Sequence, residues 1–154
     1  MGIRQAMNST RVSYTLESSL ESVNKAEQAA YDIAMKSGFD EEEVGRISMA
    51  VREATVNAVL HGNQYDPRKR VTVSFETSPD TLAVSVRDEG KGLNPGIIPD
   101  PLAPENLLKE SGRGIFLIRA FMDEVRFRNM EPGTEITLIK HVRGVDRDDK
   151  EDSK

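Results

Sequence analysis

Cysteine is absent from the 154 residues of this chain. Disulfide bonds and thiolate metal sites are therefore excluded, and the composition suits a reducing compartment. Long apolar runs are missing too: no segment approaches the ~18 residues that a membrane helix needs, and residues 1–11 lack the apolar core of a signal peptide. We expect a cytoplasmic protein without a membrane-spanning segment.

Basic residues are fewer than acidic residues. Lysine and arginine number 21 against 26 aspartate and glutamate residues, which leaves a formal net charge of −5. A protein that neutralises nucleic-acid phosphates needs a basic face, so we expect no direct nucleic-acid partner. A short basic run at residues 68–70 is compatible with a local basic patch or with a solvated loop.

The length suits one domain, because domains commonly hold about 100–150 residues. Hydrophobic residues make up 37% of the chain and recur at regular spacing, which is typical of a folded domain. We predict a single domain over residues 1–142. Residues 143–154 form a charged tail with no apolar residue after Val145, and we predict that this tail is disordered.

Two helices are predicted in the first part of the chain. Ser18 begins the first, and Glu21 three residues later completes a capping box. Asp40 and Glu43 begin the second in the same way. Apolar residues recur at helical spacing along both segments and should face the core: Leu20, Val23, Ala26, Ala30 and Ile33 in the first, and Val44, Ile47, Val51, Ala54 and Ala58 in the second.

Alternating polar and apolar residues predict strands over residues 11–16, 71–76, 82–87, 125–128 and 135–141. A proline-containing segment separates the third strand from a further helix that follows Gly112. Because neighbouring strands lack crossover helices, this order predicts an α+β fold of two layers. Its sheet should be largely antiparallel or mixed, with helices over one face and a polar, exposed second face.

Glu53 and Asn57 stand four residues apart in the second predicted helix, so their side chains share one face, one turn apart. A carboxylate and an amide in this arrangement can orient a water or hydroxyl and hold a hard cation through oxygen ligands. The same spacing is compatible with a solvated helix face.

Asp88 continues the alternation of Val84 and Val86, which places an acid on the apolar face of a strand. Burial of a carboxylate is costly without hydrogen-bonding partners, and the amino group of a nucleobase would be one such partner. Gly90 and Gly92 permit a tight turn and close approach of the backbone to a ligand. A simple strand-ending turn is the alternative.

Gly112, Arg113 and Gly114 stand directly before the last predicted helix. Glycines at a helix N-terminus expose amide donors, the helix dipole favours phosphate there, and Arg113 could add a charge-assisted contact. Thr134 could hydrogen-bond a ligand where a strand begins. An ordinary loop-to-helix junction and a hairpin turn are the alternatives.

The order of these motifs resembles that of the Bergerat-fold ATPases, the superfamily of gyrase, the mismatch-repair ATPase and the sensor histidine kinases. Within it, the chain is most similar to the bacterial anti-sigma-factor serine/threonine kinases. The segments that carry the resemblance are Glu53-Ala-Thr-Val-Asn57-Ala-Val-Leu-His61-Gly62-Asn63 and Met122-Asp-Glu-Val-Arg126. The resemblance covers residues 12–140 and implies the histidine-kinase-like ATPase fold.

The resemblance implies ATP and Mg²⁺ as cofactors. Asn57 would hold the magnesium ion that bridges the phosphates, and Glu53 would be the general base that prepares the attacking hydroxyl. Arg113 and Gly114 would approach the phosphates, under a lid formed by residues 93–111.

At the other end of the nucleotide, the resemblance implies that Asp88 accepts a hydrogen bond from the adenine amino group. Gly90 and Gly92 would shape the turn beside the base. Thr134 would support the adenine end.

The resemblance also implies a serine/threonine kinase that phosphorylates a STAS-domain anti-anti-sigma protein, sequesters a sigma factor and forms a homodimer. The chain has no P-loop and no D-F-G signature, so a eukaryotic-type kinase is not expected. One alternative is a non-catalytic ATP-binding switch, which would not require Glu53. Another is the detached catalytic domain of a histidine kinase, against which the short lid and the missing phospho-acceptor domain argue.

Overall fold

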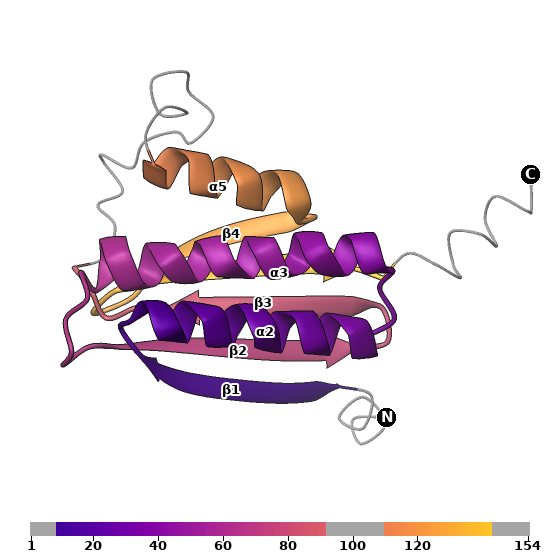
Figure 1. Cartoon of the computed structure of the whole chain (residues 1–154), viewed down its shortest axis with the longest axis horizontal. Helices are drawn as coiled ribbons and strands as arrows, with labels where there is room; N and C mark the ends of the chain where they lie inside the picture. Colours follow the sequence, from indigo (N-terminus) through magenta and orange to yellow (C-terminus); the bar gives the residue numbers. More distant parts are fainter. Residues whose placement is uncertain (1–8, 92–109, 143–154) are drawn as a thin grey trace, which may run out of the picture.

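The computed structural model describes residues 9–91 and 110–142 (Figure 1). These residues form helices α2 (Leu20–Lys36), α3 (Glu41–Val56) and α5 (Glu110–Phe121), a π-helical turn η1 (Asn57–Gly62), and strands β1 (Thr10–Glu17), β2 (Arg70–Ser78), β3 (Thr81–Arg87), β4 (Glu124–Asn129) and β5 (Thr134–His141). The predicted α+β order is confirmed in the described part, and the predicted tail lies outside it. Among the described residues, no helix has both the length and the apolar character needed to cross a membrane.

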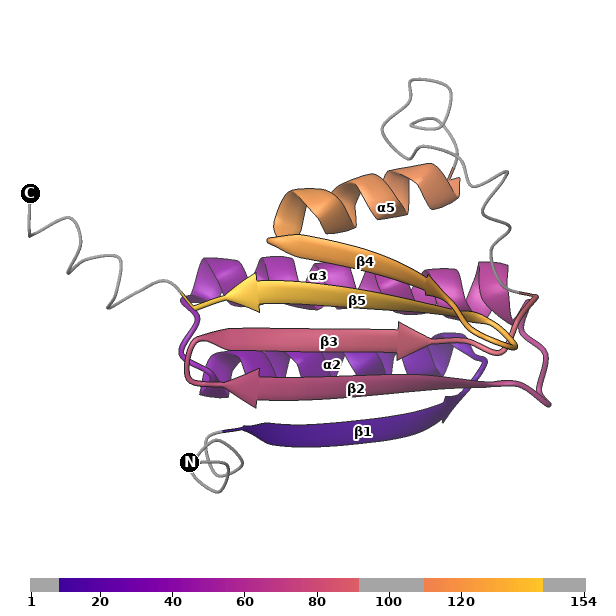
Figure 2. The same cartoon turned by 180° about the vertical axis from the view of Figure 1, so that it is seen from behind.

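The five strands form one sheet in the order β1-β2-β3-β5-β4, and every neighbouring pair is antiparallel (Figure 2). The prediction of a largely antiparallel or mixed sheet is therefore narrowed to an antiparallel one. Register places side chains of one type in rows across the strands. One row is Tyr14, Val73, Val86, Ile136 and Phe127, and the row beside it is Ser13, Ser74, Ser85, Thr137 and Arg126.

The three helices cover one face of this sheet, so the molecule has two layers (Figures 1 and 2). The apolar rows of β2, β3 and β5 face the helices and form the core with them. Small residues line the buried sides of α2 and α3, including Ala30, Ala34, Ala50 and Ala54, each 0% exposed. Small side chains let two helices and a sheet pack closely.

The two predicted helix starts have different outcomes. Asp40 caps α3 as predicted, since its side chain accepts a hydrogen bond from the N–H three residues later at 2.8 Å. The prediction that Ser18 begins the first helix was wrong. The cap of α2 is Ser19, whose Oγ accepts from the Ser22 N–H at 3.3 Å. The Ser18 hydroxyl instead donates to the Lys69 carbonyl at 2.7 Å.

Helix α5 begins earlier than predicted. It starts at Glu110, so Gly112, Arg113 and Gly114 lie inside the helix near its N-terminus and not in front of it. Two glycines weaken a helix by roughly 1 kcal/mol each, and tertiary packing must outweigh that cost. Ile118, which is 0% exposed, supplies part of the apolar contact that holds α5 in place.

Candidate functional site

The candidate site begins where α3 passes into η1 without a break. Glu53 lies in the last turns of α3, and Asn57 is the first residue of the π-helical turn. The Thr55 hydroxyl donates to the Val51 carbonyl at 2.7 Å, a local bond inside the helix. Isolated π-turns within helices are uncommon and frequently occur at functional sites. Glu53 and Asn57, which were predicted to share one helix face, therefore lie where the helix changes from α to π geometry.

Helix α5 approaches this pair through Gly114. A methyl group built on Gly114 would lie 3.5 Å from Glu53 Oε2, 3.7 Å from Asn57 Nδ2 and 3.8 Å from Asn57 Oδ1. The glycine thus lets the backbone of α5 lie against both side chains. The structure therefore brings together three of the predicted site residues, from two helices that are more than fifty positions apart in the sequence.

Asn57 has an unusual hydrogen-bonding state. Its Nδ2 atom is buried without a hydrogen-bond partner, and no other buried side-chain nitrogen or oxygen in residues 9–91 and 114–142 shares this state. Buried polar groups are nearly always paired, so an unpaired one calls for an explanation. The Asn57 amide lies close to Gly114 and to the Glu53 carboxylate, and its unpaired nitrogen could form a hydrogen bond with a polar ligand.

Asp88 directly follows β3 and is 7% exposed, as its alternation with Val86 predicted. Its Oδ1 accepts hydrogen bonds from the Gly90 N–H at 2.9 Å and the Thr134 N–H at 3.2 Å. Its own N–H donates to the Thr134 carbonyl at 2.9 Å. Within the described part of the chain, Oδ2 accepts no hydrogen bond, so one carboxylate oxygen is available to a ligand.

Burial raises the pKa of Asp88 above its ordinary value, because an ionised carboxylate loses its hydration there. The hydrogen bonds from Gly90 and Thr134 and the positive charge of Lys69 act in the opposite direction and lower that pKa. Desolvation is the larger effect. A perturbed carboxylate with one oxygen unused is a typical candidate for ligand recognition.

Three glycines surround Asp88, and two of them were missed as site residues. A methyl group on Gly62 would collide with the Asp88 carboxylate, and one on Gly133 would collide with the Asp88 carbonyl. A methyl group on Gly90 would collide with the Gly62 carbonyl. Gly133 also has a φ of +99°, which other residues rarely adopt. In the sequence, Gly62 stands within the segment that resembles the anti-sigma-factor kinases and Gly133 stands before a predicted strand, and neither position indicates a contact with Asp88.

The remaining predicted site residues are placed as follows. Thr134 is the first residue of β5 and is 8% exposed beside Asp88. Gly112 and Arg113 lie in α5, close to its N-terminus. Gly92 and residues 93–109 of the predicted lid lie outside the described residues, whereas the last two residues of that lid, 110 and 111, are the first two of α5.

A methyl group at Gly62 gives a direct test of the Asp88 half of the site. In Gly62→Ala, the added carbon displaces the carboxylate, so nucleotide affinity should fall at least about 10-fold by titration calorimetry. The matched control is Gly45→Ala in α3, where a methyl group meets nothing within 4 Å. That control should gain about 0.5–1 kcal/mol of stability and keep wild-type affinity. Equal affinities of all three proteins would contradict the placement of the ligand at Asp88.

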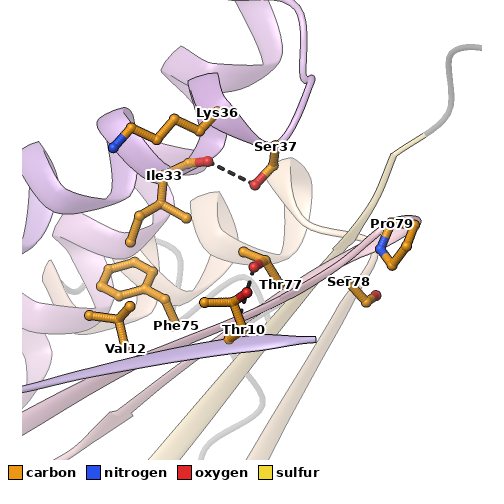
Figure 3. A pocket seen from close by; sticks show the side chains of 9 residues that line it. All are labelled: Thr10, Val12, Ile33, Lys36, Ser37, Phe75, Thr77, Ser78 and Pro79. Atoms are coloured by element: carbon orange, nitrogen blue, oxygen red, sulfur yellow. Dashed lines mark hydrogen bonds between the residues drawn. The ribbon is translucent and has the colours of Figure 1, made fainter. Parts of the chain in front are cut away.

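The surface also has a hollow at the other end of the sheet (Figure 3). It lies between α2, the edge strand β1 and the neighbouring strand β2, and its lining includes Val12, Ile33, Phe75 and Pro79. Pro79 stands in the hairpin that joins β2 to β3, whereas Asp88 follows the far end of β3. The hollow is therefore separate from the candidate site.

Comparison with known proteins agrees with this geometry. The family model described as "Histidine kinase-like ATPase domain" matches residues 16–140. The anti-sigma F factor of Anoxybacillus flavithermus is 33% identical over 140 residues, which cover 88% of this chain and 93% of that protein. The serine-protein kinase RsbW of Bacillus subtilis is 32% identical over 124 residues, 75% of this chain and 77% of that protein.

Among solved structures, the chain resembles a crystal structure of the RsbU and RsbW domains of a Mycobacterium tuberculosis protein. The TM-score is 0.62 at 19% identity, and the match covers 85% of this chain and 32% of that one. At this identity the likeness supports the fold. The family model and the sequence relatives establish that the chain belongs to the histidine kinase-like ATPase family, which uses ATP, and within it to the anti-sigma-factor serine/threonine kinases.

Proposed function

We propose that this kinase transfers the terminal phosphate of ATP to a serine or threonine of a STAS-domain anti-anti-sigma protein, and that it also sequesters a sigma factor. The observation that carries the proposal is the unpaired, buried amide of Asn57, which lies against Gly114 beside the Glu53 carboxylate. The names of the relatives, anti-sigma F factor and serine-protein kinase RsbW, support the choice of partners.

The adenine of ATP would lie at Asp88. Its amino group would donate to Oδ2, the carboxylate oxygen that accepts neither the Gly90 nor the Thr134 N–H. Those two bonds hold the carboxylate in place before the ligand arrives, so little ordering is needed on binding. Gly90, Gly92 and Thr134 would line the base, and Gly62 and Gly133 would leave room for the carboxylate itself.

The phosphates would lie at the junction of α3 and α5. The residues there fit Mg²⁺. One terminal atom of the Asn57 amide is buried without a hydrogen-bond partner, and the oxygen and nitrogen of an asparagine amide can exchange places by rotation of the amide. The amide oxygen could therefore occupy that position and bind the ion. Among the described residues, no cluster of three acidic or histidine side chains could hold a metal alone. Mg²⁺ commonly takes one or two protein oxygens and completes its shell with phosphates and water. Bound there, the ion would neutralise charge on the phosphates.

Glu53 would act as the general base. Its Oε2 faces the same space as Asn57 and Gly114, so it would accept the proton of the attacking hydroxyl near the terminal phosphate. The N-terminus of α5, with Gly112 and Arg113, would contribute amide donors and positive charge to the phosphates. Phosphoryl transfer depends mainly on such positioning and charge neutralisation. The part of the predicted lid that precedes α5, residues 93–109, would close over the nucleotide and exclude water.

The assembly would be a cytoplasmic homodimer. Each protomer would consist of one kinase domain, residues 1–142, and a disordered tail, residues 143–154. The STAS protein and the sigma factor would compete for the kinase, so that phosphorylation of the STAS protein leaves the sigma factor bound. Neither nucleic acid nor a membrane would be a direct partner.

Phosphate transfer to a STAS-domain protein from the same organism tests this proposal. The kinase is incubated with labelled ATP, Mg²⁺ and the STAS protein, and the product is treated with acid. We expect label on serine or threonine that survives acid, whereas a histidine kinase domain would yield acid-labile phosphohistidine. Binding of ATP without any transfer would favour a nucleotide-gated switch and would contradict the kinase proposal. A pull-down with and without ATP, followed by identification of bound proteins, tests the sigma-factor partner.

A further inference from the structure

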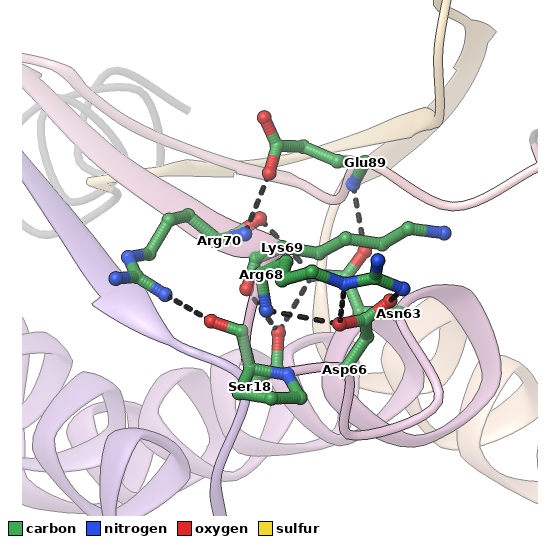
Figure 4. A network of polar contacts seen from close by, with 8 residues as sticks. Ser18, Asn63, Asp66, Arg68, Lys69, Arg70 and Glu89 are labelled. Atoms are coloured by element: carbon green, nitrogen blue, oxygen red, sulfur yellow. Dashed lines mark hydrogen bonds and ion pairs between the residues drawn. The ribbon is translucent and has the colours of Figure 1, made fainter.

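Asn63 is a buried side chain whose amide is fully engaged, in contrast to that of Asn57. The residue is 1% exposed. Its Nδ2 donates to Ser18 Oγ at 2.9 Å and to the Arg70 carbonyl at 3.0 Å, and its Oδ1 accepts from the Glu89 N–H at 2.8 Å (Figure 4). Both amide hydrogens and the carbonyl oxygen are used. One side chain thus joins three segments that are distant in sequence.

The third of these bonds reaches the turn that carries Asp88. Glu89 stands between Asp88 and Gly90, the residue whose N–H bonds to the Asp88 carboxylate. The Asn63 bond therefore holds the backbone in the middle of that turn. Gly62, next to Asn63 in sequence, packs against Asp88 and Gly90. Two consecutive residues at the end of η1 thus define where the turn lies, one by hydrogen bonding and one by packing.

Additional bonds close the network around Asn63. The Arg70 N–H donates to Glu89 Oε1 at 2.6 Å, and the Ser18 hydroxyl donates to the Lys69 carbonyl at 2.7 Å. The start of β2 is therefore tied both to the Asp88 turn and to the junction of β1 and α2. The Arg70–Glu89 bond is exposed, whereas the Asn63–Ser18 bond at the centre of the network is buried. A buried side chain such as Asn63 is held rigidly when all its polar groups are paired, and loss of the amide leaves its partners unpaired.

We propose that Asn63 is a positioning residue for adenine recognition. It holds the Asp88–Gly90 turn in the position from which the Asp88 carboxylate can accept a hydrogen bond from the amino group of a base, and this bond selects adenine. The inference rests on the proposed placement of adenine at Asp88. Asn63 itself contacts neither the base nor the phosphates, and it acts through the Glu89 backbone. The amide is required, because a carboxylate at this position would have no hydrogens for Ser18 and the Arg70 carbonyl.

Nucleotide selectivity tests this role. Affinities for ADP and GDP are measured by titration calorimetry for the wild type and Asn63→Asp. ADP affinity should fall about 10-fold while GDP affinity changes little, since guanine has no amino group at the corresponding position and gains nothing from a well-placed acceptor. The preference for ADP over GDP therefore falls by the same factor. Equal weakening of both nucleotides, or unchanged ADP affinity, would overturn the proposal.

Controls separate this inference from the function on which it rests. Asn24→Asp makes the same chemical change at an exposed position of α2, where the Asn24 side chain accepts a hydrogen bond from Arg52, and it should leave both affinities unchanged. If Asn63→Asp does not fold, Ser18→Ala removes one partner of the amide and should lower the ADP preference about 2- to 3-fold. An unchanged preference in Ser18→Ala would then overturn the proposal. A wild type that binds ADP and GDP equally would instead refute the adenine assignment at Asp88.

Discussion

Replacement of Glu53 by alanine should lower the rate of phosphate transfer to the STAS protein at least about 100-fold, because a positioned general base contributes typically 10²–10⁴-fold to catalysis. ATP affinity should change less than about 3-fold, since Glu53 would act on the attacking hydroxyl and not on the nucleotide. The measurements are initial rates at saturating ATP and the dissociation constant of ADP. The effect should therefore be confined to the rate of transfer.

The size of this effect follows from the position of the carboxylate. Glu53 Oε2 faces Gly114 next to Asn57, where the phosphates are proposed to lie. Glu53→Gln should show nearly the same loss, because an amide keeps the shape and polarity of the side chain but cannot take the proton. Glu42→Ala is the matched control on the same helix, since Glu42 forms an exposed ion pair with Arg46. It should retain wild-type rates.

Two outcomes would contradict this assignment. Undiminished transfer by Glu53→Ala would show that the proton leaves by another route, and that positioning alone supports catalysis. A loss of ADP binding equal to the loss of rate would place Glu53 in nucleotide binding and would remove the main distinction between a kinase and a switch.

Much of the fold could be predicted because its signals are local. Alternation along Val84 and Val86 predicted both the strand and the burial of Asp88, and the structure confirms both. The four-residue spacing of Glu53 and Asn57 likewise required only helical geometry. Such signals need no knowledge of the partner segments, which is why they are readable in one sequence.

The missed features depend on long-range contacts. Asp88 packs closely against Gly62 and Gly133, and neither sequence neighbourhood shows this contact. Ser18 has the features of a helix cap, yet its hydroxyl is used by Asn63 and Lys69. A local capping rule cannot anticipate a competing tertiary partner.

Lys140 illustrates the same point on the core side. It continues the alternation of Ile136 and Leu138 on β5, which would place a charge in the core. The structure resolves this conflict with ion pairs from Lys140 to Glu43 at 3.3 Å and to Asp123 at 3.8 Å. Glu43 lies in α3 and Asp123 lies directly before β4, so both partners come from outside β5. Burial of a paired lysine is acceptable where burial of a lone one is not. Strand alternation accounts for the buried position of Lys140 but gives no sign of its partners.

Asp88→Asn should weaken ADP binding about 10- to 100-fold, the range for loss of a hydrogen bond to a charged acceptor. The asparagine can keep the bonds from Gly90 and Thr134 on its oxygen, which leaves an NH₂ group to face the adenine amino group. Two donors then oppose each other. Asp80→Asn, at the hairpin end of the same strand, is the control and should keep wild-type affinity. Unaltered affinity in Asp88→Asn would remove the adenine assignment.

The ligand-free Asp88→Asn protein should be as stable as the wild type at pH 7 or more stable. Burial raises the pKa of Asp88 in the folded protein, so between the unfolded and folded pKa values the folded state binds more protons. Wild-type stability therefore falls as pH rises through that window, and the neutral asparagine avoids this loss. Thermal unfolding of both proteins from pH 7 down to pH 4 should show their difference narrowing as pH falls. A variant that loses ADP binding without losing stability separates recognition by Asp88 from its role in the fold.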